Sequence, residues 1–310
     1  MDRTIALSEI KKVVDEAYEA FKSSKEGSVD DLLQGVDDKA FGISVVLTDG
    51  TVINKGDVNV ASPLGGIIKV PLSTILLSQN SPDELVKKSG KCPCSCGNGA
   101  KKEHIHGSHA IRAISAIEPT GDPDSKWNFI ENRMIDLMGS APQLDVKLYE
   151  SLKKKAADDN LVNALAENGF YLYDDAATSV DISVKARSMT ASAEQLATMA
   201  ATIAADGVNP VSGKIVFDGE IAKNVVGMMA AKGPRKMTLP WNMSVGLPAK
   251  SSFGGAVVGV FPGVMGVAAY SPLLMPNRVS EKAAKAIKYI MNKLDISVFQ
   301  SASLKVDKDK

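Results

Sequence analysis

Apolar residues recur at helical spacing close to both ends of the chain. Between residues 5 and 24 they fall on one face of a helix, and residues 279–294 repeat the pattern. The apolar positions of the first segment are Ile5, Ile10, Val13, Val14, Ala17, Tyr18 and Phe21. Each predicted helix therefore has one face that must pack on another part of the protein.

Two segments have the pattern of strands joined by tight turns. Residues 41–47 and 51–55 are rich in apolar and β-branched residues and flank the turn signal Asp49-Gly50. Residues 255–261 and 264–270 are almost continuously apolar and flank Pro262-Gly263. Each pair predicts an antiparallel hairpin.

The middle of the chain is mainly helical in pattern. Residues 66–78 form a continuous apolar run that predicts a buried helix, with Pro71 near its first turn. Helical spacing continues from 110 to 205 and is best over 192–205, where Ser192 is a suitable N-cap.

This order of elements predicts an α+β fold. We expect strands from both ends of the chain to join one antiparallel sheet, with the terminal helices on one face and a helical subdomain beside it. We expect one domain over 1–310, with its sheet part at about 1–65 and 207–300 and its helical part at about 66–206. A cleft is expected where the parts meet, and the polar tail 301–310 is expected to fray.

Composition narrows the choice of partners. Hydrophobic residues make up 45% of the 310 residues, which is typical of a globular protein. Lys+Arg and Asp+Glu each total 36, and this zero net charge argues against nucleic acid or an anionic membrane. No apolar run approaches the ~20 residues that span a bilayer, and the acidic N-terminal helix is no signal peptide. We therefore expect a soluble, cytoplasmic protein.

Four segments resemble one known family. They are FGISVVLTDGTVINKGD at 41–57, DPDSKW at 122–127, GVNPVSGKIVF at 207–217 and VGLPAKSSFGGAVVGVFPGVMGVAAYSP at 245–272. Together they closely resemble the glutaminases, a family with the serine β-lactamase and penicillin-binding-protein fold. The resemblance covers most of residues 5–295. It implies that fold, a small-molecule ligand in a cleft, and a homodimer or homotetramer.

The family's nucleophile is missing. Glutaminases use Ser-x-x-Lys at the start of the buried helix, and the matching residues here are Gly66, Ile67, Ile68 and Lys69. Glycine has no side-chain atom that could attack a carbonyl, so no acyl-enzyme can form at this position. The retained Lys69 is a relic, a buried lysine with a lowered pKa, or a ligand for an anion, and the sequence does not separate these three.

The family's pocket positions are also changed. Arg112 stands where the family has an asparagine, and Leu152 where it has a glutamate. Ser183 and Arg235 stand at two tyrosine positions, and Phe253 replaces a valine. Losing the glutamate removes the countercharge for the amino group of glutamine, while the arginines favour an anion. The resemblance and these changes together predict a small anionic ligand.

Every cysteine and histidine of the chain lies in one short segment, 92–109. These residues are Cys92, Cys94, Cys96, His104, His106 and His109. Thiolates and imidazoles together suit a transition metal, and Gly97 and Gly99 let the chain fold back on itself. We predict one metal ion, zinc first. Iron or cobalt is the alternative, because Cys94-Ser95-Cys96 resembles the Cys-Ser-Cys of nitrile hydratases. The site could be catalytic or structural, or the thiols could simply stay reduced.

Three hypotheses of function follow. The first is a glutaminase-fold protein repurposed to bind or convert a small anion, with a metal-activated water that hydrolyses or hydrates a carbon–nitrogen bond. The second is glutaminase activity retained through another nucleophile, Ser62 or Ser73. The third is a non-catalytic binding subunit.

Overall fold

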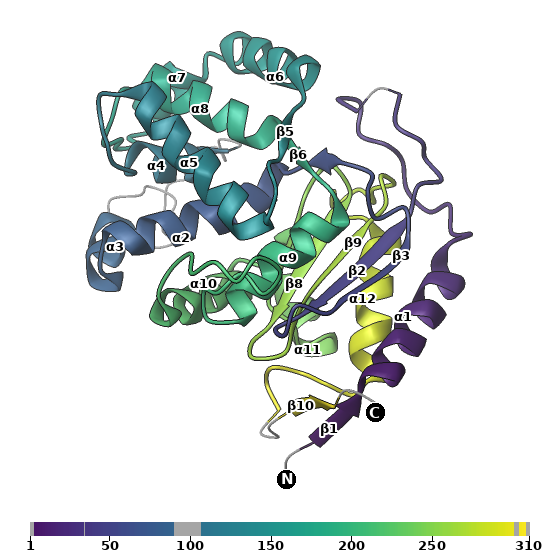
Figure 1. The fold of residues 1–310 in the computed structure, drawn as a ribbon. Helices are drawn as coiled ribbons and strands as arrows, with labels where there is room; N and C mark the ends of the chain where they lie inside the picture. The colour runs from purple at the N-terminus through teal and green to yellow at the C-terminus, as the bar shows by residue number, and fades with distance from the viewer. Residues whose placement is uncertain (1–2, 34, 90–106, 301–303, 308–310) are drawn as a thin grey trace.

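A five-stranded antiparallel sheet organises the molecule (Figure 1). The computed structural model describes residues 3–33, 35–89, 107–300 and 304–307. The sheet has the order β3-β2-β9-β8-β7. Its strands are β2 (Gly42–Leu47), β3 (Val52–Gly56), β7 (Ala249–Ser251), β8 (Ala256–Phe261) and β9 (Met265–Tyr270). Both predicted hairpins are therefore confirmed, and strands from the two ends of the sequence join directly where β2 pairs with β9.

Helices cover both faces of this sheet, which explains why its central strands are apolar throughout. On one face lie α1 (Leu7–Phe21) and α12 (Glu281–Lys293), as predicted. The other face is covered by α9 (Ala193–Ala204), which begins at Ser192 with a capping box. A Cβ at Gly266 of β9 would lie 2.2 Å from the Ala197 carbonyl oxygen, so only glycine permits this close packing.

The remaining helices form the predicted helical part, which lies at one end of the molecule in Figure 1. Its described elements begin with the short helix η1 (Gly65–Ile68) and α2 (Lys69–Gln79). They continue with α3 (Pro82–Ser89), α4 (Ser108–Ser115), α5 (Pro123–Met138), α6 (Val146–Asp158), α7 (Leu161–Glu167) and α8 (Ala176–Ser188). A small sheet of β4 (Ser62–Pro63), β6 (Met189–Ala191) and β5 (Gln143–Leu144) links this part to the large sheet.

Three features differ from the sequence predictions. Although α9 falls within 66–206, it covers the large sheet, and it also packs against α5 of the helical part. Residues 207–245, assigned to the sheet part, carry α10 (Gly219–Ala231), η2 (Arg235–Met237) and α11 (Thr238–Ser244). The tail expected to fray contains β10 (Leu304–Asp307), which pairs in parallel with β1 (Arg3–Ala6). Among the helices of the described residues, none is long and apolar enough to cross a membrane.

Candidate active-site cleft

Gly66 lies at the turn that leads into the buried helix α2. Most apolar residues of η1 and of the first two turns of α2 are buried, which fixes this turn against the core, and Gly66 and Lys69 are half-buried. A Cβ at Gly66 would lie 2.9 Å from the carbonyl oxygen of Ser251 on β7. Either the turn or β7 must therefore shift to admit any side chain at position 66.

Phe253 fills the space next to this turn. Gly65 has a φ of +46°, and a Cβ there would lie 2.6 Å from the Phe253 ring. Phe253 and Leu152 are both buried in one apolar cluster, together with Ile111. Leu152 is only 6% exposed, so this position offers no polar group to an ammonium ion. Leu152 and Phe253, which the sequence predicted as separate pocket positions, therefore belong to one apolar cluster.

Two half-buried lysines lie near this turn. Strand β7, which carries Lys250, contacts η1, which leads into Lys69, and the charge of Lys69 acts on Lys250. Burial, and then the charges of Lys69 and Lys232, together lower the pKa of Lys250 to about 7. Burial also lowers the pKa of Lys69, with added repulsion from Arg187, Arg235 and Lys232. No ion pair joins either lysine to an acidic side chain within the described ranges.

Two arginines complete this group of charges. Arg235 adopts a left-handed backbone, with φ of +53°, and its buried Nε has no hydrogen-bond partner in the part of the chain described. Arg187 comes from α8, and burial, then Arg278 and Arg235, lower its pKa to about 10. Arg278 is paired with Asp30. We call Lys69, Arg187, Arg235 and Lys250 the cationic cluster.

The sequence prediction missed two members of the cationic cluster. Lys250 lies in the segment 245–272 that resembles the family but was not predicted as a site residue, and Arg187 was not singled out. Arg187 lies four residues after Ser183 on the same predicted helix, so the comparison that identified Ser183 could have found it. Ser183 itself is 1% exposed, and its hydroxyl has no partner among the described residues.

Arg112 makes a different contact. It is 8% exposed, and its Nη2 donates a hydrogen bond to the Lys88 carbonyl oxygen near the end of α3. Carbonyls at a helix C-terminus carry partial negative charge and favour such a cation. The described contacts of Arg112 therefore tie it to α3 and not to Lys69.

The alternative nucleophiles are placed as follows. Ser62 is buried in β4, where it pairs with Ala191 of β6. The Ser73 hydroxyl donates a 2.7 Å hydrogen bond to the Lys69 carbonyl oxygen within α2. The Ser73 hydroxyl is thus engaged with the backbone of its own helix.

Most of the predicted metal ligands fall outside the described residues. These are Cys92, Cys94, Cys96, His104 and His106, whereas His109 is exposed on α4. Within the described ranges, no group of three or more histidine, cysteine or acidic residues is placed to hold a metal. Gly107 precedes α4, and a Cβ there would lie 3.2 Å from Nη1 of Arg187. One end of the 92–109 segment therefore adjoins the cationic cluster.

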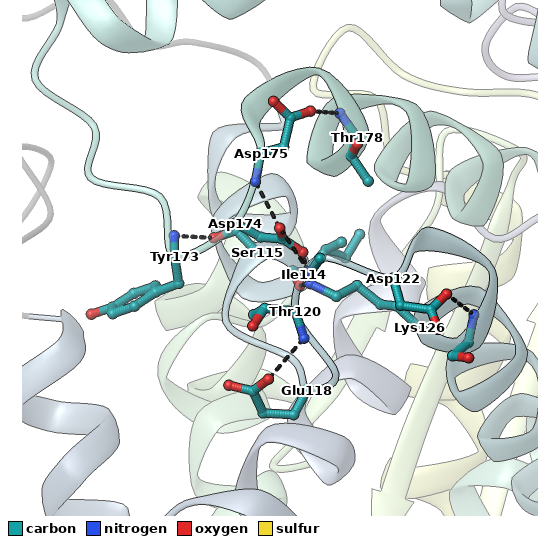
Figure 2. Close-up of polar contacts among 12 residues, drawn as sticks. Ile114, Ser115, Glu118, Thr120, Asp122, Lys126, Tyr173, Asp174, Asp175 and Thr178 are labelled. Atoms are coloured by element: carbon teal, nitrogen blue, oxygen red, sulfur yellow. Dashed lines mark hydrogen bonds and ion pairs between the residues drawn. The ribbon is translucent and has the colours of Figure 1, made fainter.

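Lys126 can be compared with Lys69 and Lys250, because it is a buried lysine that has an acidic partner. It lies on α5 and is fully buried, and its amine donates to Asp174 and to the Ile114 carbonyl oxygen (Figure 2). Asp174 also accepts hydrogen bonds from the backbone N–H groups of Gly121 and Asp175. Burial raises the pKa of Asp174, but these hydrogen bonds outweigh it and hold the pKa below its ordinary value.

The fold and the Gly66–Lys69 turn define a class of protein, and comparison with known proteins agrees. The profile of the Glutaminase family matches residues 28–299, so the chain belongs to the glutaminase family. It is 36% identical to the glutaminase of Bacteroides fragilis, over 99% of both chains. It is also 36% identical to that of Bacteroides thetaiotaomicron, over 98% of this chain and 99% of the relative.

Solved structures of this family share the β-lactamase-like fold. The probable glutaminase ybaS superposes with a TM-score of 0.88 and 27% identity, over 96% of this chain and 100% of that one. A probable glutaminase from Bacillus subtilis, complexed with 6-diazo-5-oxo-L-norleucine, superposes with a TM-score of 0.80 over 94% and 96% of the two chains. At 22% identity, the second likeness concerns the fold alone.

Proposed function

We propose that this member of the glutaminase family has lost serine-dependent amide hydrolysis and binds a small carboxylate anion in the old cleft. The observation that carries the proposal is the pair Lys69 and Lys250, for which the described residues supply no acidic partner, together with the buried Arg235 Nε that has no hydrogen-bond partner among them. Cations withdrawn from water without a partner are costly, and a bound anion removes that cost. Buried Leu152 offers no countercharge to the amino group of glutamine.

Loss of the serine chemistry rests on Gly66. Purified protein should release no ammonia from glutamine at a rate typical of enzymes. Its relatives are named glutaminases, so saturable turnover of glutamine would favour the alternative, in which Ser62 or Ser73 serves as the nucleophile. That result would contradict the proposal.

Anion binding is tested by thermal melting with succinate, citrate and phosphate, using glutamine and lysine as comparison ligands. A ligand at one hundred times its Kd adds about 2.7 kcal/mol to the free energy of unfolding and so raises Tm. Arg235→Gln should abolish the rise. The matched control is Arg133→Gln, which changes a partly buried arginine of α5 that contacts Phe129 and should leave the rise intact. No rise with any of the three anions would contradict the proposal.

Anion binding without any turnover would favour the non-catalytic binding subunit. Turnover would call for a catalytic group, and for this we keep the prediction of one transition-metal ion at the 92–109 segment. A metal-activated water could replace the serine in attacking a carbon–nitrogen bond. The position of Gly107 beside Arg187 supports a site close to the cleft.

The metal prediction is tested by elemental analysis of untagged protein purified without chelator. We expect about one equivalent per chain, zinc first, with loss of metal in both Cys94→Ala and Cys96→Ala. Less than about a tenth of an equivalent of any metal would reject the prediction. Loss of metal with activity retained would make the site structural.

We also propose a homodimer or homotetramer, which rests on the family resemblance. Light scattering at micromolar concentration should give a particle heavier than one chain of 32.7 kDa. A particle of single-chain mass would contradict it.

A further inference from the structure

A cavity separate from the cleft lies between α11, the loop at 275–279 and the first turns of α12. Its volume is about 510 Å³, which suits a small molecule. Apolar side chains make up most of its wall, and one of them, Trp241, belongs to the buried cluster that holds α1 and α12 to the large sheet. Of the described residues that line it, none is Gly66, Lys69 or Lys250. The cavity is therefore a second site and not an extension of the cleft.

One acceptor at this cavity has no donor. Glu281, in the first turn of α12, lines the cavity, and its Oε1 lies 2.9 Å from the Lys285 amine. Its other oxygen, Oε2, is buried and has no hydrogen-bond partner among the residues that the structure describes. A carboxylate oxygen withdrawn from water without a donor is costly, and a bound N–H group would remove that cost.

The charges around Glu281 favour a cationic donor over a neutral one. Lys285 is shared between Glu281 and Glu26, with its amine 2.9 Å from an oxygen of each. One lysine therefore meets two carboxylates, and one negative charge is left over. Lys288 also lines the cavity, but it is exposed, so water screens its charge. An ammonium group beside Glu281 would balance the charge of these paired side chains.

We propose that this cavity binds a small apolar amine, with its ammonium group on Glu281 Oε2 and its apolar body against Trp241. An aryl-alkylamine has this form, because it joins one charged donor to an apolar ring. The ring would displace water from the apolar wall, and a hydrogen bond between charged groups is stronger than one between neutral groups. This assignment is independent of the proposed anion site, since its ligand has the opposite charge.

Fluorine NMR of the full-length protein labelled with 5-fluorotryptophan tests the proposal, with phenethylamine as the probe. The chain has two tryptophans, so Trp127, which does not line the cavity, is an internal control. The Trp241 resonance is assigned as the one retained in Trp127→Phe or absent from Trp241→Phe. We expect phenethylamine to shift it saturably, with a Kd of about 1 mM or tighter, and to leave Trp127 unchanged. No saturable shift of Trp241 up to about 10 mM would overturn the proposal.

Two substitutions test the carboxylate. Glu281→Gln removes its negative charge and should weaken phenethylamine binding at least about tenfold. Glu16→Gln is the matched control, because it removes a carboxylate that accepts a hydrogen bond from Tyr289 of α12 and does not line the cavity. The control should leave the Kd unchanged. Unchanged affinity in Glu281→Gln would overturn the assignment of the ammonium group to that carboxylate.

3-Phenylpropionate, which carries a carboxylate on the same apolar body, tests the sign of the charge. Its Kd, measured by the Trp241 shift, should be at least about ten times that of phenethylamine. Binding as tight as that of phenethylamine would overturn the proposal, and its loss in Lys288→Gln would assign the cavity to an anion instead. Succinate, a ligand of the proposed cleft site, should leave Trp241 unchanged. A saturable shift of Trp241 by succinate would overturn the assignment of a separate amine site.

Discussion

Lys126 and Lys250 are both withdrawn from water, but the protein provides for their charges differently. Lys126 lies in a segment that resembles the glutaminases, and Asp174 neutralises it within the fold. The charge of Lys69 acts on Lys250, and the described residues supply neither with an acidic partner. The first arrangement stabilises the protein without a ligand. The second is unfavourable by itself, and the proposed anion would offset its cost.

The two lysines therefore differ in how the protein neutralises their charge. The Lys126–Asp174 pair holds α5 and α4 to the segment before α8. Around Gly66, by contrast, the sequence comparison predicts the loss of the nucleophile and of the carboxylate for the amino group, while Lys69 is retained and Lys250 lies in a segment that resembles the family.

The largest loss of stability is expected when Asp174, the partner of Lys126, is replaced. Asp174→Asn leaves a fully buried ammonium group without its countercharge and should lower the free energy of unfolding by about 3–5 kcal/mol. Urea denaturation measures this. Asp175→Asn is the matched control, because asparagine caps α8 as well as aspartate does and should cost less than about 0.5 kcal/mol. Equal losses in the two variants would show that the pair does not neutralise a buried charge.

Replacing Lys250 is expected to raise the free energy of unfolding, whereas replacing Asp174 lowers it. Between pH 7 and the ordinary lysine pKa of 10.5, the unfolded chain binds a proton that folded Lys250 does not, so stability rises with pH. The charges of Lys69 and Lys232 contribute to this depression. Lys250→Met should raise the free energy of unfolding at pH 7 by about 1–2 kcal/mol and flatten the rise from pH 7 to 9. Urea denaturation at a series of pH values measures both effects. A destabilised variant with an unchanged pH profile would contradict the unpaired state of Lys250.

A smaller effect is expected at Gly66. Gly66→Ser should lower the free energy of unfolding by about 1 kcal/mol, because its Cβ meets the Ser251 carbonyl oxygen, and it should not restore glutamine hydrolysis. Gly66→Ala should cost about as much, which separates the Cβ contact from the hydroxyl. Gly227→Ala, in open space on α10, should instead stabilise by about 0.5–1 kcal/mol. Glutamine turnover in Gly66→Ser would show that the cleft has not been remodelled.

Local signals made most of the fold predictable. The β8–β9 hairpin, the capping box at Ser192 and the amphipathic face of α12 each lie within one short stretch of sequence. The pairing of β1 with β10 joins opposite ends of the chain through two four-residue strands, and no local pattern marks it. Helix α10 contains glycines at both Gly219 and Gly227, which weakens its helical signal.

For a similar reason, the sequence predicted some residues of the candidate site and missed others. Gly66 and Lys69 are three residues apart and fall in one motif, so the resemblance alone predicted the loss of the nucleophile. Lys250 and Arg187 reach that turn only through the folding of β7 and α8 around it. Leu152 and Phe253 likewise join one apolar cluster although about a hundred residues separate them. Convergence of this kind is a property of the tertiary structure.

The most direct test of the central claim is an NMR titration of the lysine ε-carbons, with and without succinate. The Lys250 resonance is assigned as the one absent from Lys250→Arg. We expect it to titrate near pH 7 in the free protein and at a clearly higher pH once succinate is bound, because an anion favours the charged amine. Titration near 10.5 in the free protein, or no response to any anion that binds, would contradict an unpaired Lys250 in a site that takes an anionic ligand.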